Sequence, residues 1–324
     1  MTPLIPFFEP VKFKIPVLDF HVHGFGIMVA LGLFLGTNMA MDKAKRDGLD
    51  PDIINRVVTW MIAGIFIGGH LGYALFYEPQ RIQEEGLIYL LKFWDGLSSF
   101  GGFFFTAFLC HVFFRKENKR VQRENRARRE AGQTRFAFPV KTLHYSDCII
   151  YGFPMAFGLG RVGCFMAHDH PGLVSSFPLA VYGICQETWG DTSIACHDLG
   201  LYEAIWALTL IPVIRMMDKA KGRFQGYYMA FVLMYYAPVR FSLDYLRTVD
   251  ARYFGLTPGQ YASIALFLMG LSIYAIMRKT QPVREMTAAE GWLGAAAARE
   301  PAPPDAGDSG EADPQDSEKS GESV

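Results

Sequence analysis

The sequence predicts an all-α membrane protein with about seven transmembrane helices, the N-terminus outside and the C-terminus inside. The first reason is composition: 51% of the 324 residues are hydrophobic and 15% are aromatic, and the mean hydropathy is +0.14. This is too apolar for a typical soluble enzyme. The second reason is a series of apolar segments close to the length of about 20 residues with which a helix crosses a bilayer.

Seven such segments are predicted as spans. In chain order they cover residues 22–41, 53–77, 97–114, 146–167, 200–217, 226–246 and 259–277. The third and the fifth are rather short, so a partly re-entrant course is the alternative for these two.

The distribution of Lys and Arg predicts the orientation. Basic residues are abundant after the first, third, fifth and seventh segments, and none lies between His168 and Gly200. Because basic loops stay in the cytoplasm, the N-terminus should be outside. The run from Arg115 to Arg135 has a nucleic-acid patch as its alternative, but in so apolar a chain a cytoplasmic loop near anionic lipid explains it better. We therefore predict a membrane partner and no nucleic acid.

The two ends of the chain differ in character. Residues 1–280 are predicted as the transmembrane domain and residues 281–324, rich in Ala, Pro, Glu, Asp and Ser, as a disordered cytoplasmic tail. The N-terminus Met-Thr-Pro-Leu-Ile-Pro lacks a positively charged region ahead of an apolar run, so the first span is expected to be its own insertion signal. Cys185 and Cys196 lie in a loop expected outside, where a disulfide is allowed, and the sequence leaves their pairing open.

One polar cluster is predicted at the outer surface of the membrane. Arg161 lies in the fourth segment, and His168-Asp169-His170 follow at its end. An arginine near hydrocarbon costs roughly 3 kcal/mol or more unless it finds a counter-charge, and an anionic lipid headgroup is suitable. Histidine beside a carboxylate predicts acid–base chemistry. The alternative is a zinc site at the His-Asp-His cluster, with further ligands from His21, His23 or His197, but no H-E-x-x-H spacing supports it, so we expect neither metal nor cofactor.

Two further patterns each have two interpretations. Arg240, Asp244 and Arg247 share one helix face, either with Arg240 paired to Asp244 or with Arg240 in a phosphate clamp together with Arg161. The glycines at 68–72 and 101–102 indicate close helix packing, or else a cleft through which lipid enters.

Residues Gly160-Arg161-Val162-Gly163-Cys164-Phe165, continuing to Asp169 and Gly172, resemble the signature Gly-Arg-x-Gly-Asn-Phe-x-Asn-x-Glu-x-x-Gly of the prolipoprotein diacylglyceryl transferases. The likeness extends over about residues 20–277. Other blocks that fall in the family's order are Gly69 to Tyr77, Trp94-Asp95-Gly96, Leu201-Tyr202-Glu203, Arg240 to Arg247, and Thr257-Pro258-Gly259-Gln260.

The resemblance implies a transferase of lipoprotein biosynthesis in the cell inner membrane, with its active site toward the outer leaflet. It would move the diacylglyceryl group of phosphatidylglycerol to the lipobox cysteine of a lipoprotein precursor and release glycerol phosphate. Arg161 and Arg240 would hold the phosphate while a base takes the proton of the incoming thiol. The substrate-binding residues that it implies are His23, His70, Tyr73, Gly101, Gly102, Gly163, Cys164, Gly172, Tyr202, Glu203, Asp244 and Arg247.

Four positions depart from the family pattern. Phe100 stands where the family has a histidine proposed as base, and the other departures are Phe25 for tyrosine, Cys164 for asparagine and His70 for arginine. Because phenylalanine moves no proton, we expect His168 or His170 to be the base, beside Asp169. The alternatives are a paralogous lipid or headgroup transferase with another acceptor, and a lipid-binding or transport protein without chemistry.

Overall fold

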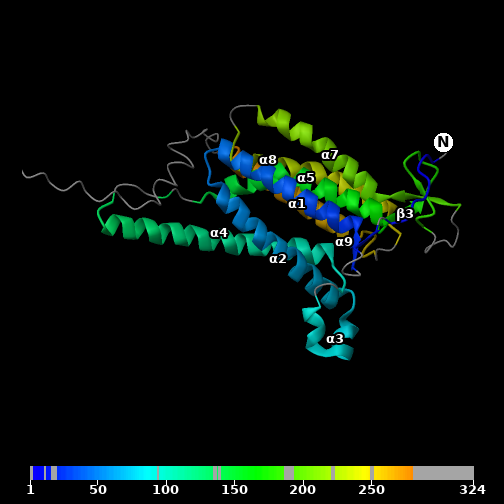
Figure 1. Ribbon diagram of the computed structural model, residues 1–324. Helices are drawn as coiled ribbons and strands as arrows, with labels where there is room; N and C mark the ends of the chain where they lie inside the picture. The colour runs from blue at the N-terminus through cyan, green and yellow to red at the C-terminus, as the bar shows by residue number, and fades with distance from the viewer. Residues whose placement is uncertain are drawn as a thin grey trace, which may run out of the picture.

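The computed structural model is a bundle of long helices with small β-sheets at one end (Figure 1). It describes residues 3–10, 12–15, 20–92, 95–133, 137, 140–185, 193–219, 223–248 and 252–279. The α-helices are α1 (Gly24–Arg46), α2 (Pro51–Phe76), α3 (Pro79–Glu85), α4 (Ser99–Glu130), α5 (Thr142–Ala167), α7 (Leu199–Asp218), α8 (Tyr227–Leu243) and α9 (Pro258–Met277). Two 3₁₀ helices are η1 (Gly86–Leu91) and η2 (Asp244–Leu246). The predicted tail, residues 281–324, lies outside the described residues.

All seven predicted segments are helical, in α1, α2, α4, α5, α7, α8 and α9. Five helices of the described part, α1, α2, α5, α7 and α9, are long and apolar enough to cross a membrane. Helix α8 has 17 residues, and α4 has 32, of which the second half is strongly charged. The protein is therefore a mostly helical, polytopic membrane protein, as the sequence predicts.

Glycines let the helices approach closely. A Cβ on Gly152 of α5 would lie 2.1 Å from the carbonyl oxygen of Gly36 in α1, and a Cβ on Gly101 of α4 would lie 2.3 Å from that of Gly68 in α2. Neither position has room for a side chain. Small residues of this kind bring helices together in membranes, where no hydrophobic force drives their association.

Helix starts are fixed by side chains that accept backbone N–H groups. Asp198 begins α7 by accepting from Leu201, and Thr257 and Gln260 form a reciprocal capping box at α9. Asp147 of α5 accepts from the N–H groups of Gly226, Tyr227 and Met229 and so ties the start of α8 to α5. These contacts fix the helices that carry the polar residues of the site.

Two small sheets, which the all-α prediction omits, lie at one end of the bundle. Strands β1 (Lys12–Ile15) and β2 (Phe20–His23) form an antiparallel hairpin, and β5 (Ala195–Asp198) pairs with both β3 (Pro171–Val174) and β4 (Val181–Tyr182). Strands of two to four residues are too short to show an alternating pattern, so the sequence gives no signal for them. Cys185 and Cys196 form a disulfide within the larger sheet region.

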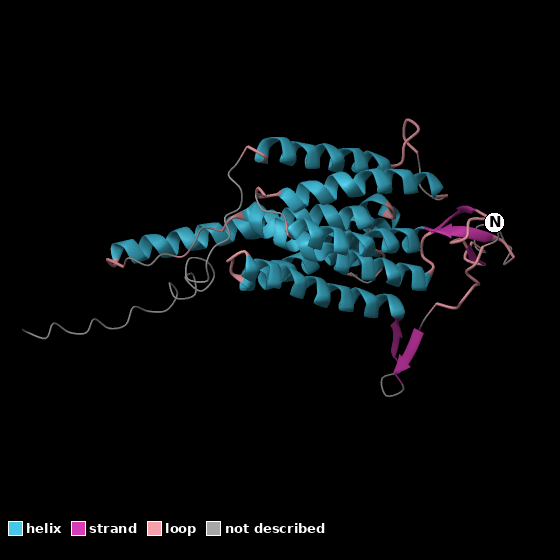
Figure 2. Ribbon diagram, turned by 90° about the horizontal axis from the view of Figure 1, so that it is seen from above, coloured by secondary structure: helices cyan, strands magenta, loops and turns pink. Residues whose placement is uncertain are grey.

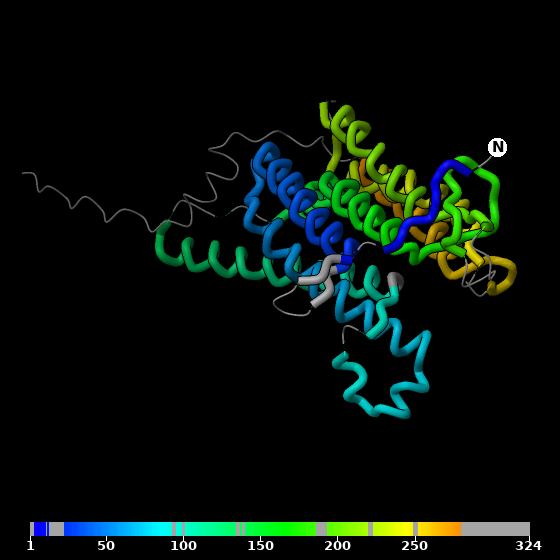
Figure 3. Tube along the Cα trace, turned by 45° about the vertical axis from the view of Figure 1, so that its right-hand side comes forward, coloured from blue at the N-terminus to red at the C-terminus, as the bar shows by residue number. Residues whose placement is uncertain are grey.

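The N-terminal residues 3–10 lie on this sheet region. Ile5 forms a parallel bridge with Val181, and the N–H of Leu4 donates to the carbonyl of Pro178. Figure 3 shows this first segment running beside the loop that follows α5. The start of the chain therefore packs against residues 171–185.

The two ends of the bundle are chemically different. Figures 1 and 2 show the strands at one end and the charged half of α4 extending beyond the other. The strand end holds the C-termini of α2, α5 and α8 and the starts of α1, α4, α7 and α9. The polar residues predicted from the sequence at the ends of these helices, among them Asp169, Glu203 and Asp244, therefore lie at the same end of the molecule.

Candidate active site

Two arginines share one buried carboxylate. Nε of Arg161, on α5, lies 2.7 Å from Oε2 of Glu203 on α7, and Nη1 of Arg240, on α8, lies 3.6 Å from Oε1 of the same side chain. Glu203 is 2% exposed, whereas the arginine side chains keep 15% and 17% of their surface. Three helices thus place two guanidinium groups around one anionic centre.

Arg240 is held on its other side by Asp244. Its Nη2 lies 2.8 Å from Oδ1 of Asp244, and Oδ2 of the same carboxylate accepts a hydrogen bond from the Thr257 hydroxyl. Nη1 of Arg240 has no hydrogen-bond partner among the described residues, although it is buried. The internal pair predicted for Arg240 is therefore present: Asp244 orients the guanidinium, and one of its nitrogens makes no hydrogen bond to the described residues.

Aromatic side chains line this group. The Arg161 guanidinium lies 5.1 Å from the ring centroid of Phe157, and Tyr236 donates a hydrogen bond to Glu203 at 3.3 Å. A ring face attracts a cation, so Phe157 helps to hold Arg161 where few water molecules reach it. Neither aromatic residue is predictable from the sequence, because an apolar segment rich in Phe and Tyr gives no sign of which rings face a charge.

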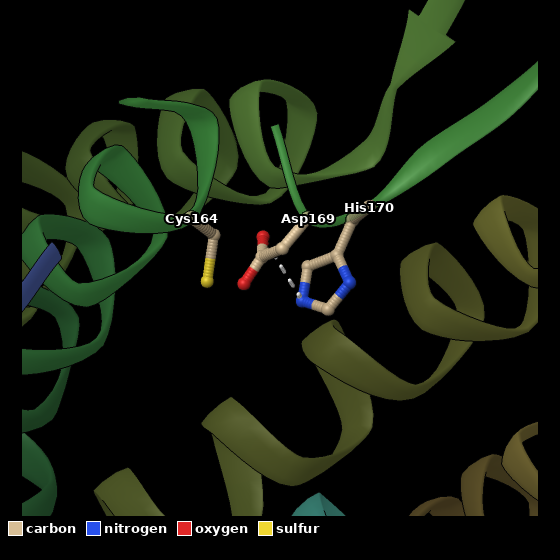
Figure 4. A group of neighbouring side chains, drawn as sticks. All are labelled: Cys164, Asp169 and His170. Atoms are coloured by element: carbon tan, nitrogen blue, oxygen red, sulfur yellow. Dashed lines mark ion pairs between the residues drawn. The ribbon is translucent and has the colours of Figure 1, made fainter. Parts of the chain in front are cut away.

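A second polar group adjoins the arginines. Sγ of Cys164, a carboxylate oxygen of Asp169 and a ring nitrogen of His170 all lie within 4.8 Å of one another, and Figure 4 shows the three side chains pointing into one space. Nε2 of His170 is 3.8 Å from Oδ1 of Asp169, and Nη1 of Arg161 is 3.8 Å from Sγ of Cys164. The cluster predicted by the sequence is thus joined to Arg161 through Cys164.

The environment favours a neutral imidazole at His170. Burial lowers the pKa of His170 to about 3, and the charges of Arg161, Arg247 and Arg240 act in the same direction. Burial raises the pKa of Asp169, while the charge of Arg161 opposes this effect. At neutral pH His170 is therefore unprotonated but only weakly basic, and an anion bound to the arginines would raise its pKa and make it a stronger base.

His168 has a different setting from His170. Its Nε2 lies 2.9 Å from the carbonyl oxygen of Phe8, and its ring packs among Phe7, Phe8 and Phe165. Its backbone is left-handed, with φ 55°, and ends α5. The structure therefore brings His170 to the arginines and brings His168 to the N-terminal segment.

Further residues near the cluster are predicted site residues. Gly172 forms an antiparallel bridge with Arg247, and a Cβ on Gly172 would lie 2.8 Å from the carbonyl oxygen of Leu246. Gly163 lies close to Phe25, at the start of α1. Tyr202, one residue before Glu203, has its hydroxyl 2.7 Å from Nδ1 of His197.

Four predicted residues belong to the pair of helices α2 and α4. His70 is fully buried, with its ring nitrogens facing the carbonyl oxygens of Tyr89 and Gly96, and Tyr73 donates to Glu78. Gly101 packs against Gly68 and Gly72, and a Cβ on Gly102 would lie 3.4 Å or more from Ile65 and Gly69. These contacts are those of close helix packing.

The remaining predicted residues lie at the start of α1 and α4. His23 is exposed where β2 passes into α1, and Phe100 lies in the first turn of α4. The side chains of Phe100 and His21 are outside the described part of the structure.

Comparison with known proteins gives one consistent result. The family model "Prolipoprotein diacylglyceryl transferase" matches residues 10–276. Proteins named phosphatidylglycerol–prolipoprotein diacylglyceryl transferase from Chromohalobacter salexigens, Acinetobacter baumannii and Geobacter sulfurreducens are each 28% identical to this chain. The alignments cover 86%, 85% and 86% of this chain and 95%, 95% and 99% of the relatives. The chain belongs to the prolipoprotein diacylglyceryl transferase family.

Proposed function

We propose that this protein transfers the diacylglyceryl group of phosphatidylglycerol to the lipobox cysteine of lipoprotein precursors and releases glycerol phosphate. The observation that carries the proposal is the pair of arginines on Glu203 beside a neutral His170. The phosphodiester of phosphatidylglycerol would bind at the arginines, and the thiol of the lipobox cysteine would lose its proton beside it.

Arg161 and Arg240 would bind the phosphate. A guanidinium presents several N–H donors in a fixed plane, and Nη1 of Arg240 is available for a phosphate oxygen. When the carbon–oxygen bond to the phosphate breaks, the electron pair goes to that oxygen. Donors that are already in place stabilise this charge most strongly, because they need no reorganisation.

His170 would take the proton of the acceptor thiol. The thiolate then attacks the glycerol carbon next to the phosphate, so that a carbon–sulfur bond forms as the carbon–oxygen bond breaks. Asp169, 3.8 Å away, would stabilise the imidazolium that results. His170 would thus take the role of base that the family assigns to a histidine at the position of Phe100. This role is supported by the position of His170 beside Arg161 and Cys164, while His168 remains a predicted alternative.

We further propose seven spans, with the N-terminus and the site outside and the C-terminus inside. Helices α4 and α8 would be the two additional spans. The basic loops at the end opposite the strands support this orientation, as does the Cys185–Cys196 disulfide, which fits an oxidising compartment. The site would then face the outer leaflet of the inner membrane, and residues 281–324 would be a cytoplasmic tail.

The test is incubation of the purified protein with phosphatidylglycerol and a lipobox peptide, following glycerol phosphate release and the mass of the peptide. We expect diacylglyceryl on the cysteine with the unchanged protein and with Arg215→Ala, an exposed arginine toward the other end of α7. Arg161→Ala should give no product. Lipid binding without product in the unchanged protein would contradict the proposal and favour another acceptor.

A further inference from the structure

Cys164, Asp169 and His170 are three donors of the kinds that zinc binds. They occupy the last turn of α5 and the two residues after the left-handed His168, whose positive φ turns the chain back toward the helix end. The sequence favours no metal here, and its alternative zinc site combines the His168-Asp169-His170 cluster with further histidines. In the structure the third donor beside Asp169 and His170 is Cys164, in the last turn of α5.

The donor set and its spacing suit Zn²⁺. This ion takes thiolate, imidazole and carboxylate ligands, and three protein ligands leave a fourth position open. Bonds of about 2.0–2.3 Å at tetrahedral angles place two donors roughly 3.3–3.8 Å apart. His170 Nε2 and Asp169 Oδ1 are already 3.8 Å apart, and the three donors lie within 4.8 Å, so small rotations of the side chains would complete the site.

The surrounding charges permit such an ion. A thiolate and a carboxylate together cancel the two positive charges of zinc. Arg161 and Arg240 are paired with Glu203 and Asp244, which offsets part of their charge, and Arg247 adds a further positive charge near His170. Nη1 of Arg161 also donates to Sγ of Cys164 at 3.8 Å, and this contact orients the sulfur as outer-shell groups do in metal sites.

We propose that Cys164, Asp169 and His170 bind Zn²⁺ and that the bound ion reversibly inhibits the transfer. On binding, the Cys164 thiol releases its proton to solvent and a sulfur–zinc bond replaces the sulfur–hydrogen bond. The inhibitory part rests on the proposed function: zinc occupies the lone pair of His170, which then takes no proton from the acceptor thiol.

Binding is tested without any turnover. Co²⁺ alone is added to the purified protein, and thiolate-to-cobalt charge-transfer absorption is recorded, followed by displacement with Zn²⁺. We expect this absorption in the unchanged protein and in Cys110→Ser, a control at a free cysteine of α4. Cys164→Asn should lose it, and its Zn²⁺ affinity should fall by more than the roughly 10–100-fold that loss of an outer-shell partner costs. Absence of the band, or the same band in Cys164→Asn, would overturn the site.

Inhibition is tested with the peptide assay, each variant being compared with its own metal-free rate. Zinc should suppress most of the activity of the unchanged protein and of Cys110→Ser, and a chelator should restore it. Cys164→Asn should keep its own rate at the same zinc concentration. Equal inhibition of both proteins, or a rate raised by zinc, would overturn the inhibitory role. An inactive metal-free protein with a normal cobalt spectrum would count against the proposed transfer and not against the site.

Discussion

Arg161 and Glu203 form a 2.7 Å ion pair between α5 and α7 in the interior of a membrane protein. The arginine comes from the signature segment, and the glutamate lies 42 positions later in the chain. Because Glu203 also faces Arg240, one carboxylate determines the separation of the two groups that would hold the phosphate. Its substitution should therefore affect both stability and activity.

We expect Glu203→Gln to lower kcat/KM by at least about tenfold and to lower the melting temperature. Removing one partner of a buried ion pair typically costs about 3–5 kcal/mol, because the remaining charge is left uncompensated. The measurement is the peptide assay together with thermal unfolding in detergent. Glu84→Gln, at an exposed position of α3, is the control. Unchanged activity in Glu203→Gln would show that the arginines need no shared anion.

Gly259→Ala should impair transfer more than it destabilises the protein. A Cβ at this position would lie 2.8 and 2.9 Å from the carboxylate oxygens of Asp244 and 3.1 Å from Nη2 of Arg240. The Asp244 carboxylate must then move and shift the Arg240 guanidinium with it. A misplacement of about 1 Å in a group that positions the substrate can lower the rate about 100-fold. Gly26→Ala, where the added atom meets nothing within 4 Å, is the matched control. Equal rates for the two variants would refute the coupling.

The two histidines should respond differently to substitution. His170→Ala should reduce kcat by about 10²–10⁴-fold, the usual contribution of a general base, while lipid binding persists. Rates are measured at saturating lipid, and binding is measured separately. Replacing both histidines should abolish turnover. Turnover that survives the double substitution would show that neither is the base, even though the family assignment stands.

His168→Ala should loosen the N-terminal segment. The substitution removes the hydrogen bond to the carbonyl of Phe8 and the ring contacts with Phe7 and Phe8. Amide hydrogen exchange over residues 3–10 should become faster, and kcat should fall less than in His170→Ala. Unchanged exchange combined with a larger loss of kcat would instead favour His168 as the base.

Asp47 should make the stability of the protein depend on acidity. This residue follows α1, where its carboxylate pairs with Lys43 and lies 2.9 Å from Nε2 of His144. Burial raises its pKa, but the hydrogen bond from His144 and the charge of Lys43 outweigh this and lower the pKa overall. A lowered pKa in the folded state gives stability that is complete above the unfolded value of about 3.9 and is lost as the pH falls through the folded value.

The corresponding measurement is melting temperature against pH for the unchanged protein and Asp47→Asn. The gap between them should be constant from neutral pH to about 5 and should shrink below about 4. Asp42→Asn, an exposed residue of α1, should show no such gap. A gap that widens as the pH falls would contradict the assigned sign.

The sequence was sufficient for the helices and for the arginines, because both depend on patterns that survive without tertiary information. Apolar segments of span length had few alternatives, and Arg161 and Arg240 stood out as charges inside them. The partners of these residues were harder to predict. His168 and His170 are two positions apart and cannot be told apart from the sequence. The left-handed backbone of His168 gives the two side chains different surroundings, and nothing in the sequence predicts that conformation. The same conformation brings Cys164 into the cluster, which spacing alone did not indicate.

The Cys185–Cys196 disulfide is buried, so it should resist reductants added to an assay. Cys185 and Cys196 are 1% and 0% exposed, so a dissolved thiol has almost no surface to attack. The lipobox peptide, in contrast, needs a reductant in the solution to keep its cysteine free. We expect a mild reductant to protect the substrate while the enzyme's own sulfur–sulfur bond stays closed, so both can share one buffer.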